Sequence, residues 1–385
     1  MEIELSRERL IRVEEARTWL RAEVPTEPLG SIDTPDGKQR HQEWERKLSD
    51  ARWSVVHWPE RYGGRDYDLL DWLLFEEEYF AASAPVRINQ NGITLLGGTL
   101  LRHGSTDQQD RILPTISTAE QIWAQAWSEP EAGSDLASVR STAAPVEGGF
   151  VLNGQKTWSS RAAIADRGFG LFRSGEQNQG HRGLTYVMFD LRAPGVTVRP
   201  IRRIDGDPVF AEVFFDDVFV PDADVIGVVN EGWRIAMATA GAERGVALRS
   251  PGRFLAATRD LIALWRCLPL RQAARHQESV VECWSRSQQY RLHGFASAAG
   301  SETAAASLGK TFWSELDLSI HLTALAVLND LSLVEPMHDL PEPYERLHAR
   351  WTDGYLFALA GPIYAGTNQI QRNVVAERLL GLPRG

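Results

Sequence analysis

Hydrophobic positions divide this chain into three stretches of different periodicity. In the first, from residue 1 to about 120, apolar residues recur among acidic ones at close to the 3.6-residue spacing of a helix, as in the run Leu69, Leu70, Leu73, Leu74 and Tyr79. Proline, glycine and asparagine gather at 59–64 and 89–92, where we expect loops. The pattern predicts a helical N-terminal domain over residues 1–120.

In the second stretch, from about 121 to 229, apolar and β-branched residues come in short bursts at 150–152, 184–191, 196–198, 213–215 and 218–220. Pairs of turn-forming residues separate the bursts: Gly148-Gly149, Asn153-Gly154, Pro194-Gly195 and Asp216-Asp217. The gaps are too short for the helices that a parallel βαβ sheet requires. We therefore expect a middle domain of antiparallel strands over residues 121–229.

The third stretch, residues 230–385, is helical again. A run opens at Asn230 and continues through Ala247, and Pro251 then either kinks this helix or begins the next one. Residues 308–333 are strongly apolar with a helical period, and a loop before the last two helices is marked by Pro336, Pro341 and Pro343. The order of helices, strands and helices predicts an α+β fold with segregated layers.

Composition narrows the class of protein. The chain has 385 residues, 43% of them hydrophobic and 24% charged, which is typical of a globular protein. At roughly 150 residues per domain, this length corresponds to two or three domains. The net charge is −10, from 41 basic and 51 acidic residues. An acidic chain is a poor general binder of nucleic acid, because phosphate contacts need clustered lysine and arginine.

Cysteine and hydropathy patterns exclude further classes. Cys267 and Cys283 form no Cys-x-x-Cys motif and are too few for a disulfide framework, so we expect two buried or half-exposed thiols and no metal site. No run of about 18 uncharged apolar residues is present, which predicts no membrane span. The acidic start, Met1–Glu4, is unlike a signal peptide. We expect a cytoplasmic protein.

Several common catalytic and nucleotide-binding signatures are missing. The chain has no Gly-x-Gly-x-x-Gly after a strand, no His-Glu-x-x-His and no Gly-x-Ser-x-Gly. Gly309-Lys310-Thr311 is similar to the end of a phosphate-binding loop, but Ala304 stands where that loop needs glycine and no strand precedes it. We therefore expect plain helix at 309–311.

Three segments stand out together: Trp127–Leu136, Asn153–Ser160 and Ile363–Asn373. They resemble the signatures of the acyl-CoA dehydrogenase family. Three supporting segments are also similar to that family, at residues 58–64, 213–221 and 377–384. The resemblance spans nearly the whole chain in order. It implies an N-terminal helical domain, a middle β domain and a C-terminal four-helix bundle. It also implies FAD, bound non-covalently between the β domain and the C-terminal helices.

A flavin needs a flat, apolar slot with hydrogen-bond partners around its polar edge. The resemblance places a set of residues of this chain at the FAD, namely Trp127, Ser128, Trp158, Ser160, Thr367 and Gln369. It also implies that Ser134 contacts the pantetheine arm of the substrate. Without the resemblance, Ser128 and Ser160 are ordinary turn residues and Trp158 an ordinary core residue.

The family reaction removes a proton beside the thioester carbonyl and passes a hydride from the next carbon to the flavin. The proton step needs a carboxylate base in a dry pocket. In many members this base is a glutamate directly before Gly-Thr in the C-terminal motif, where this chain has Ala365. Isovaleryl-CoA and long-chain acyl-CoA dehydrogenases, and some bacterial steroid side-chain dehydrogenases, carry it on an earlier helix, in a Glu-Arg pair. Glu243-Arg244 matches that pair, which implies Glu243 as catalytic base and Arg244 as a substrate-side residue.

Other interpretations remain open. Glu243 and Arg244 taken alone are an ordinary solvated helix pair. The chain is alternatively a catalytically silent subunit with an active paralogue, or an oxygen-using flavin enzyme on the same scaffold. Residues 264–270 lack the Arg-x-x-Phe-Gly segment with which many relatives contact FAD across a subunit interface.

The resemblance also implies partners. The substrate is expected to be an acyl-CoA thioester, with a branched, long or bulky acyl chain by analogy with the shifted base. An electron-transfer flavoprotein would accept the electrons. The assembly is expected to be a homotetramer or an α2β2 heterotetramer.

Overall fold

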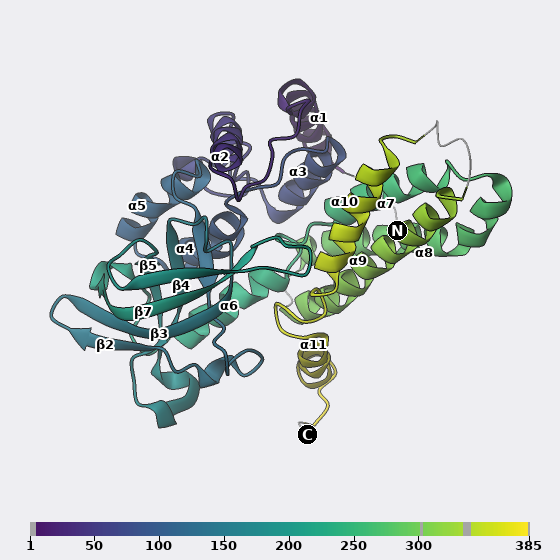
Figure 1. Cartoon of the computed structure of the whole chain (residues 1–385). Coiled ribbons are helices and arrows are strands. Elements are labelled where there is room, and N and C mark those ends of the chain that lie inside the picture. The colour runs from purple at the N-terminus through teal and green to yellow at the C-terminus, as the bar shows by residue number, and fades with distance from the viewer. Residues whose placement is uncertain (1–4, 301–302, 334–339, 384–385) are drawn as a thin grey trace. The chain divides into compact units, whose positions relative to one another are not determined.

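The computed structural model describes residues 5–300, 303–333 and 340–383 (Figure 1). Met1–Glu4, Pro336 of the expected loop and Arg384 lie outside these ranges. The chain forms two compact units. The helical unit comprises Met1–Val24, Asp68–Ala84 and Arg244–Gly385, and the sheet unit comprises Pro25–Tyr67 and Pro85–Glu243.

The helical unit contains seven α-helices within its described residues: α1 (Arg7–Glu23), α3 (Leu69–Ala81), α7 (Pro251–Trp265), α8 (Leu270–Ala299), α9 (Thr303–Leu331), α10 (Tyr344–Ala358) and α11 (Asn368–Val374). The α3 helix begins where the apolar periodicity begins, and Asp68 caps it by accepting a hydrogen bond from the Asp71 N–H. Ser250 caps α7, whose first residue is Pro251. Pro251 therefore begins a helix rather than kinking one.

Aromatic side chains form the centre of the helical bundle. The Phe254 ring of α7 packs edge-to-face on Tyr290 of α8, with ring centres 5.3 Å apart, and stacks on Trp313 of α9 at 6.4 Å. All three side chains are buried. The expected plain helix at 309–311 is confirmed, because these residues lie inside α9.

The sheet unit contains eight strands and four α-helices: α2 (Pro35–Asp50), α4 (Gly98–His103), α5 (Thr106–Ser117), β1 (Trp123–Ala126), β2 (Thr142–Val146), β3 (Gly149–Ser160), β4 (Arg167–Arg173), β5 (Leu184–Asp190), β6 (Val196–Ile201), β7 (Phe210–Pro221), β8 (Val225–Ile226) and α6 (Gly232–Arg244), which ends at the first residue of the helical unit. The strands form one sheet in the order β6-β7-β3-β2-β4-β5-β8, and β1 pairs with β4. Most pairings are antiparallel, as predicted, whereas β1–β4 and a single β2–β4 bridge are parallel.

Two of the expected turns are wrong. Asn153-Gly154 and Asp216-Asp217 lie inside the long strands β3 and β7, where the pairing register shifts. The Asn153 amide donates to the Asp217 carboxylate at 2.9 Å, and the Asp217 N–H donates to the Asn153 side-chain oxygen at 3.0 Å. Gly154 and Asp217 have φ angles of +134° and +51°. A paired bulge needs the same residue types as a turn, which explains the error.

The other expectations about composition can be compared with the described residues. Cys283 is buried and Cys267 half-exposed, and both are free thiols, as expected. Among the described residues no group of three or more histidine, cysteine or acidic side chains is placed to hold a metal ion. None of the described helices is both long enough and apolar enough to cross a membrane.

Two adjacent glycines test how tightly the start of α4 packs: Gly97 directly precedes the helix and Gly98 is its first residue. A Cβ atom on Gly97 would lie 2.0 Å from the buried Trp58 ring, whereas one on Gly98 would meet nothing within 4 Å. We predict that Gly97→Ala lowers the free energy of unfolding by about 1–3 kcal/mol through overpacking. Gly98→Ala, the matched control, should raise it by up to ~1 kcal/mol, because alanine favours helix. Equal effects of the two changes in urea denaturation would contradict this packing.

Candidate active site

The segments 127–136 and 153–160 lie side by side in the sheet unit. Trp127 directly follows β1, and residues 153–160 form the second half of β3. The Thr157 N–H donates to the Ser128 carbonyl at 2.8 Å. The Lys156 ammonium donates to the Glu129 carboxylate at 2.7 Å. Hydrogen bonds thus join residues that are far apart in the sequence.

The Lys156–Glu129 ion pair is buried, and Lys156 is 0% exposed. Its ammonium also donates to the carbonyls of Leu171 at 2.6 Å and Trp127 at 3.4 Å. Glu129 additionally accepts the N–H groups of Arg140 and Ser141, at 2.6 and 3.0 Å. Neither partner can be recognised from the sequence, because spacing alone does not show that two charges meet inside a sheet.

The two charges affect each other's ionisation. Burial lowers the pKa of Lys156 to about 8, against the opposing effect of Glu129. Burial also opposes ionisation of Glu129, but the Lys156 charge and the N–H donors outweigh it and hold the pKa of this carboxyl below its usual range. Both groups are therefore charged at neutral pH, and each charge stabilises the ionised form of the other.

Trp158 is presented to solvent from a break in the sheet. The register between β3 and β7 shifts between Lys156 and Ser159, and Trp158 has a φ of +57°. Its side chain is 60% exposed and packs edge-to-face on Phe210, with ring centres 6.0 Å apart. The interpretation of Trp158 as a core residue is therefore wrong.

The remaining predicted cofactor residues of this unit lie around the same segments. Ser128 and Ser160 are half-buried. The Asn91 amide donates to the Ser160 carbonyl at 3.4 Å. Trp127 is buried and meets Tyr186 edge-to-face, with ring centres 6.1 Å apart. Ser134 is exposed, and no described contact brings it to the others.

Glu243 lies in the last turn of α6 and is half-buried. The Gln125 amide of β1 donates to its carboxylate at 3.4 Å. The carboxylate of α6 is thereby held against the strand that leads into Trp127 and Ser128. Within the sheet unit, the predicted base and the predicted flavin-facing segment are adjacent.

The α6 helix is fixed to the sheet at its start and its middle. A Cβ atom on Gly232 would lie 2.5 Å from the Tyr186 backbone nitrogen, so only glycine allows this close approach. The Tyr186 hydroxyl donates to Thr239 at 3.4 Å, and Thr239 and Thr99 share a hydrogen bond of 2.6 Å. Burial raises the pKa of Tyr186, and the charge of Glu243 adds to this effect, so the hydroxyl stays neutral.

The third segment, 363–373, belongs to the helical unit. Thr367 caps α11 by accepting a hydrogen bond from Ile370, and Gln369 is exposed. Ala365 and Gly366 both have positive φ angles, +56° and +76°, and form a tight turn. The predicted cofactor residues Thr367 and Gln369 therefore stand at the start of a short helix that follows this turn.

Arg244 reaches the same turn within the helical unit. Its guanidinium donates to the buried Gln371 at 3.4 Å, and the Gln371 amide donates to the carbonyls of Ala365 and Gly366 at 3.3 and 3.2 Å. Arg244 is half-buried. The interpretation of Glu243 and Arg244 as a solvated pair does not fit these contacts.

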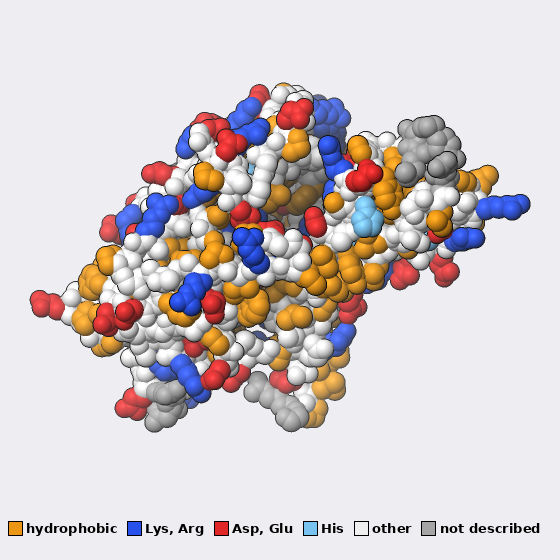
Figure 2. Space-filling model, viewed as in Figure 1, with side chains coloured by type: hydrophobic (Ala, Val, Ile, Leu, Met, Phe, Trp, Pro, Cys, Tyr) orange, Lys and Arg blue, Asp and Glu red, His pale blue; other side chains and the backbone are white. Residues whose placement is uncertain are grey.

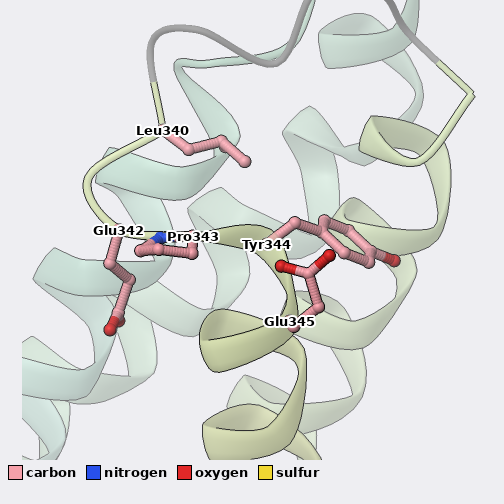
Figure 3. A pocket seen from close by; sticks show the side chains of 5 residues that line it. All are labelled: Leu340, Glu342, Pro343, Tyr344 and Glu345. Atoms are coloured by element: carbon pink, nitrogen blue, oxygen red, sulfur yellow. The ribbon is translucent and has the colours of Figure 1, made fainter.

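Other surface features do not coincide with the predicted residues. A hollow of about 310 Å³ is lined by residues 340 and 342–345, at the start of α10 (Figure 3). All five come from one short segment, and none is a predicted site residue. Figure 2 shows lysine and arginine side chains scattered over the visible face among acidic and apolar ones.

Comparisons with known protein families cover nearly the whole chain. Residues 6–120 match the acyl-CoA dehydrogenase N-terminal domain, residues 124–218 the middle domain, and residues 230–380 the C-terminal domain. The three matches follow one another in chain order.

Individual relatives agree with these matches. The chain is 38% identical over 354 residues to the acyl-CoA dehydrogenase IpdE1 of Mycobacterium tuberculosis, covering 90% of this chain and 89% of that relative. Among solved structures, the Tcur3481-Tcur3483 steroid ACAD is similar with a TM-score of 0.85 and 22% identity, covering 100% of both chains. The ChsE4-ChsE5 complex from Mycobacterium tuberculosis is similar with a TM-score of 0.82 and 25% identity, also covering 100% of both chains.

The buried ion pair makes a stability prediction. Lys156→Met leaves the Glu129 carboxylate enclosed without its counter-charge, so we expect a loss of about 3–5 kcal/mol in the free energy of unfolding. Arg140→Ala is the matched control, because it removes the exposed Arg140–Glu131 pair but keeps the backbone N–H that Glu129 accepts. This control should change stability little.

The stability difference between wild type and Lys156→Met should depend on pH, in a direction that follows from the lowered pKa of Glu129. A carboxyl whose folded-state pKa is depressed contributes stability above its unfolded pKa, here about 4.5, and loses it as the pH falls further. We therefore expect the free energies of unfolding of wild type and Lys156→Met, measured in denaturant titrations, to approach each other below pH 4.5. A difference that stays constant or widens in acid would contradict the assigned charges.

Proposed function

The chain belongs to the acyl-CoA dehydrogenase family, and we propose that it desaturates an acyl-CoA thioester with Glu243 as the base that takes the α-proton. One observation carries the choice of base: Glu243 is half-buried in the last turn of α6 and hydrogen-bonded to Gln125 of β1. At the other family position for the base, this chain has Ala365, which cannot take a proton.

The residues of the sheet unit fit FAD, the cofactor of this family. The exposed Trp158 ring offers a wide apolar surface, and the half-buried hydroxyl residues Ser128 and Ser160 lie on the segments beside it. We propose Trp127, together with these three, as the flavin-binding residues of this unit. Thr367 and Gln369 are proposed to contribute from the helical unit. FAD, when bound, supplies the acceptor for the hydride that leaves the β-carbon.

The proton step depends on how Glu243 is held. The Gln125 amide orients one carboxylate oxygen, and the hydrogen bonds of Thr239 fix the helix that carries it. A base held in one position transfers a proton faster than one that must be ordered in each cycle. Arg244 and Ser134 are proposed as substrate contacts, at the acyl-thioester end and along the pantetheine arm.

The acyl group is proposed to be bulky, of the kind that steroid breakdown produces. The position of the base on the earlier helix supports this, and so does the similarity to a steroid ACAD across the whole chain. An electron-transfer flavoprotein is proposed as the partner that would accept the electrons.

The assembly is proposed to be a homotetramer or an α2β2 heterotetramer. The ChsE4-ChsE5 relative is a complex of two named chains. In this chain, α8 exposes the large apolar side chains Val281, Trp284 and Leu292, each about half accessible to solvent. Exposed apolar groups along one helix are typical of a subunit interface.

Anaerobic titration tests the base directly. We expect one class in a panel of acyl-CoAs to bleach the visible flavin absorbance of the purified protein. Glu243→Gln should slow this bleaching by about 10²–10⁴-fold while retaining flavin, because a general base contributes about that much. Glu231→Gln, the same change at an exposed residue directly before α6, is the matched control and should bleach at the wild-type rate.

Three results would contradict the proposal. Bleaching of Glu243→Gln at the wild-type rate would place the base elsewhere. A flavin-containing protein that no acyl-CoA bleaches, but that becomes active on co-expression with a paralogue, would identify a silent subunit. Rapid reoxidation of the reduced flavin by oxygen, with no reaction with an electron-transfer flavoprotein, would identify an oxygen-using enzyme.

A further inference from the structure

An arginine that lies beside two aromatic rings is found in the connection between α6 and α7 of the helical unit. The Arg249 guanidinium carbon is 5.2 Å from the ring centre of Trp313 and 5.2 Å from that of Tyr364. Trp313 belongs to α9, and Tyr364 belongs to the loop before α11. Three distant parts of the sequence thus meet at one positive charge.

The polar atoms of this cluster lack hydrogen-bond partners among the residues the structure describes. The Arg249 Nε, the Tyr364 hydroxyl and the Trp313 indole nitrogen are each enclosed without an acceptor or donor. Enclosed polar atoms are nearly always paired in folded proteins, and each unpaired one destabilises the fold. All three can donate a hydrogen bond, so the missing partner is an acceptor.

Several other arginines of the chain are paired with carboxylates. Arg87 meets Glu45 at 2.9 Å, Arg253 meets Asp317 at 3.0 Å, and Arg291 meets Glu77 at 2.7 Å. Within the described ranges, no carboxylate lies at ion-pair distance from Arg249. Arg249 is only half-buried, so its guanidinium is partly accessible to an incoming group.

A purely structural role explains only part of this arrangement. Stacking of Arg249 on Trp313 and Tyr364 is favourable as a cation–π contact. It does not satisfy Nε, the hydroxyl or the indole nitrogen, because ring faces accept these donors only weakly. An oxygen acceptor would satisfy them and balance the charge.

The cluster shares its segments with the proposed active site. Arg249 follows Glu243 by six residues, and Tyr364 directly precedes Ala365. We propose that Arg249, with Tyr364 and Trp313, recognises an oxygen acceptor, a carboxylate or a ketone, at the remote end of the acyl group. This inference rests on the proposed function, since it assigns the substrate class of that same site. The preferred substrate is then an oxygenated acyl-CoA rather than a plain hydrocarbon one.

Binding of unreactive ligands tests the assignment without turnover. The probes are S-alkyl-CoA thioethers of equal chain length that end in a carboxylate, a ketone or a methyl group, titrated calorimetrically into the flavin-containing protein. Wild type should bind one oxygenated probe at least about tenfold more tightly than the methyl probe, because unpaired site donors reject the analogue that lacks the acceptor. The carboxylate and ketone probes distinguish the two sources of the oxygen.

Three substitutions separate recognition from packing. Arg249→Met should remove the preference. The affinity for the oxygenated probe should fall roughly tenfold or more, whereas the affinity for the methyl probe should stay within about threefold of wild type. Arg249→Lys keeps the charge but loses the planar fork, so an intermediate preference is expected. Tyr364→Phe keeps the ring on which Arg249 stacks and should lose only the contribution of the hydroxyl. The two conservative variants decide the question if Arg249→Met fails to fold.

Several outcomes would overturn the inference. These are an absence of preference in wild type, an equal loss of affinity for all three probes in the Arg249 variants, or a loss of flavin in place of a change in probe affinity. Because no turnover is measured, a preference that depends on Arg249 can be observed even if Glu243 proves not to be the base. Flavin bleaching, measured separately, reports on the base alone.

Discussion

The arrangement of the predicted flavin-facing segments depends on the buried ion pair of Lys156 and Glu129. Lys156 of β3 and Glu129 after β1 neutralise each other inside the sheet, and each also holds backbone groups of the neighbouring segment. Without the pair, two charges and several backbone groups would lie unsatisfied in the core. With it, Ser128 and Trp158 are fixed on adjoining segments. Trp158 is exposed on its segment, and we propose that its ring meets the flavin.

A second constraint acts on the helix that carries the proposed base. Gly232 allows α6 to begin against the backbone of β5, and Thr239 joins it to Tyr186 and Thr99. The boundary between the two compact units falls directly after Glu243. The Glu243 carboxylate accepts a hydrogen bond from Gln125 of the sheet unit, whereas the Arg244 guanidinium donates one to Gln371 of the helical unit. One dipeptide supplies a residue to each unit.

The periodicity of the sequence predicted the order of helices, strands and helices. It left open whether Pro251 kinks a helix or begins one, and the structure shows that it begins α7. It failed at Asn153-Gly154 and Asp216-Asp217, because a bulge and a turn use the same residues and only the pairing of β3 with β7 tells them apart. The flavin and base assignments came from resemblance rather than periodicity. The Lys156–Glu129 pair and the Arg249 cluster were missed, since both depend on contacts between residues remote in sequence. The sequence also does not show that, among the residues the structure describes, no carboxylate lies at ion-pair distance from Arg249.

The central claim, that Glu243 is the base, is tested most directly by measuring the loss of the α-hydrogen to solvent. An acyl-CoA that reduces the flavin is labelled with deuterium at the α-carbon and incubated with the protein in the absence of oxygen, and the label retained is read by mass spectrometry. The account predicts that wild type releases the deuterium and that Glu243→Gln, with its flavin in place, retains it. Release by the variant at the wild-type rate would show that another group removes the proton, and would contradict the account.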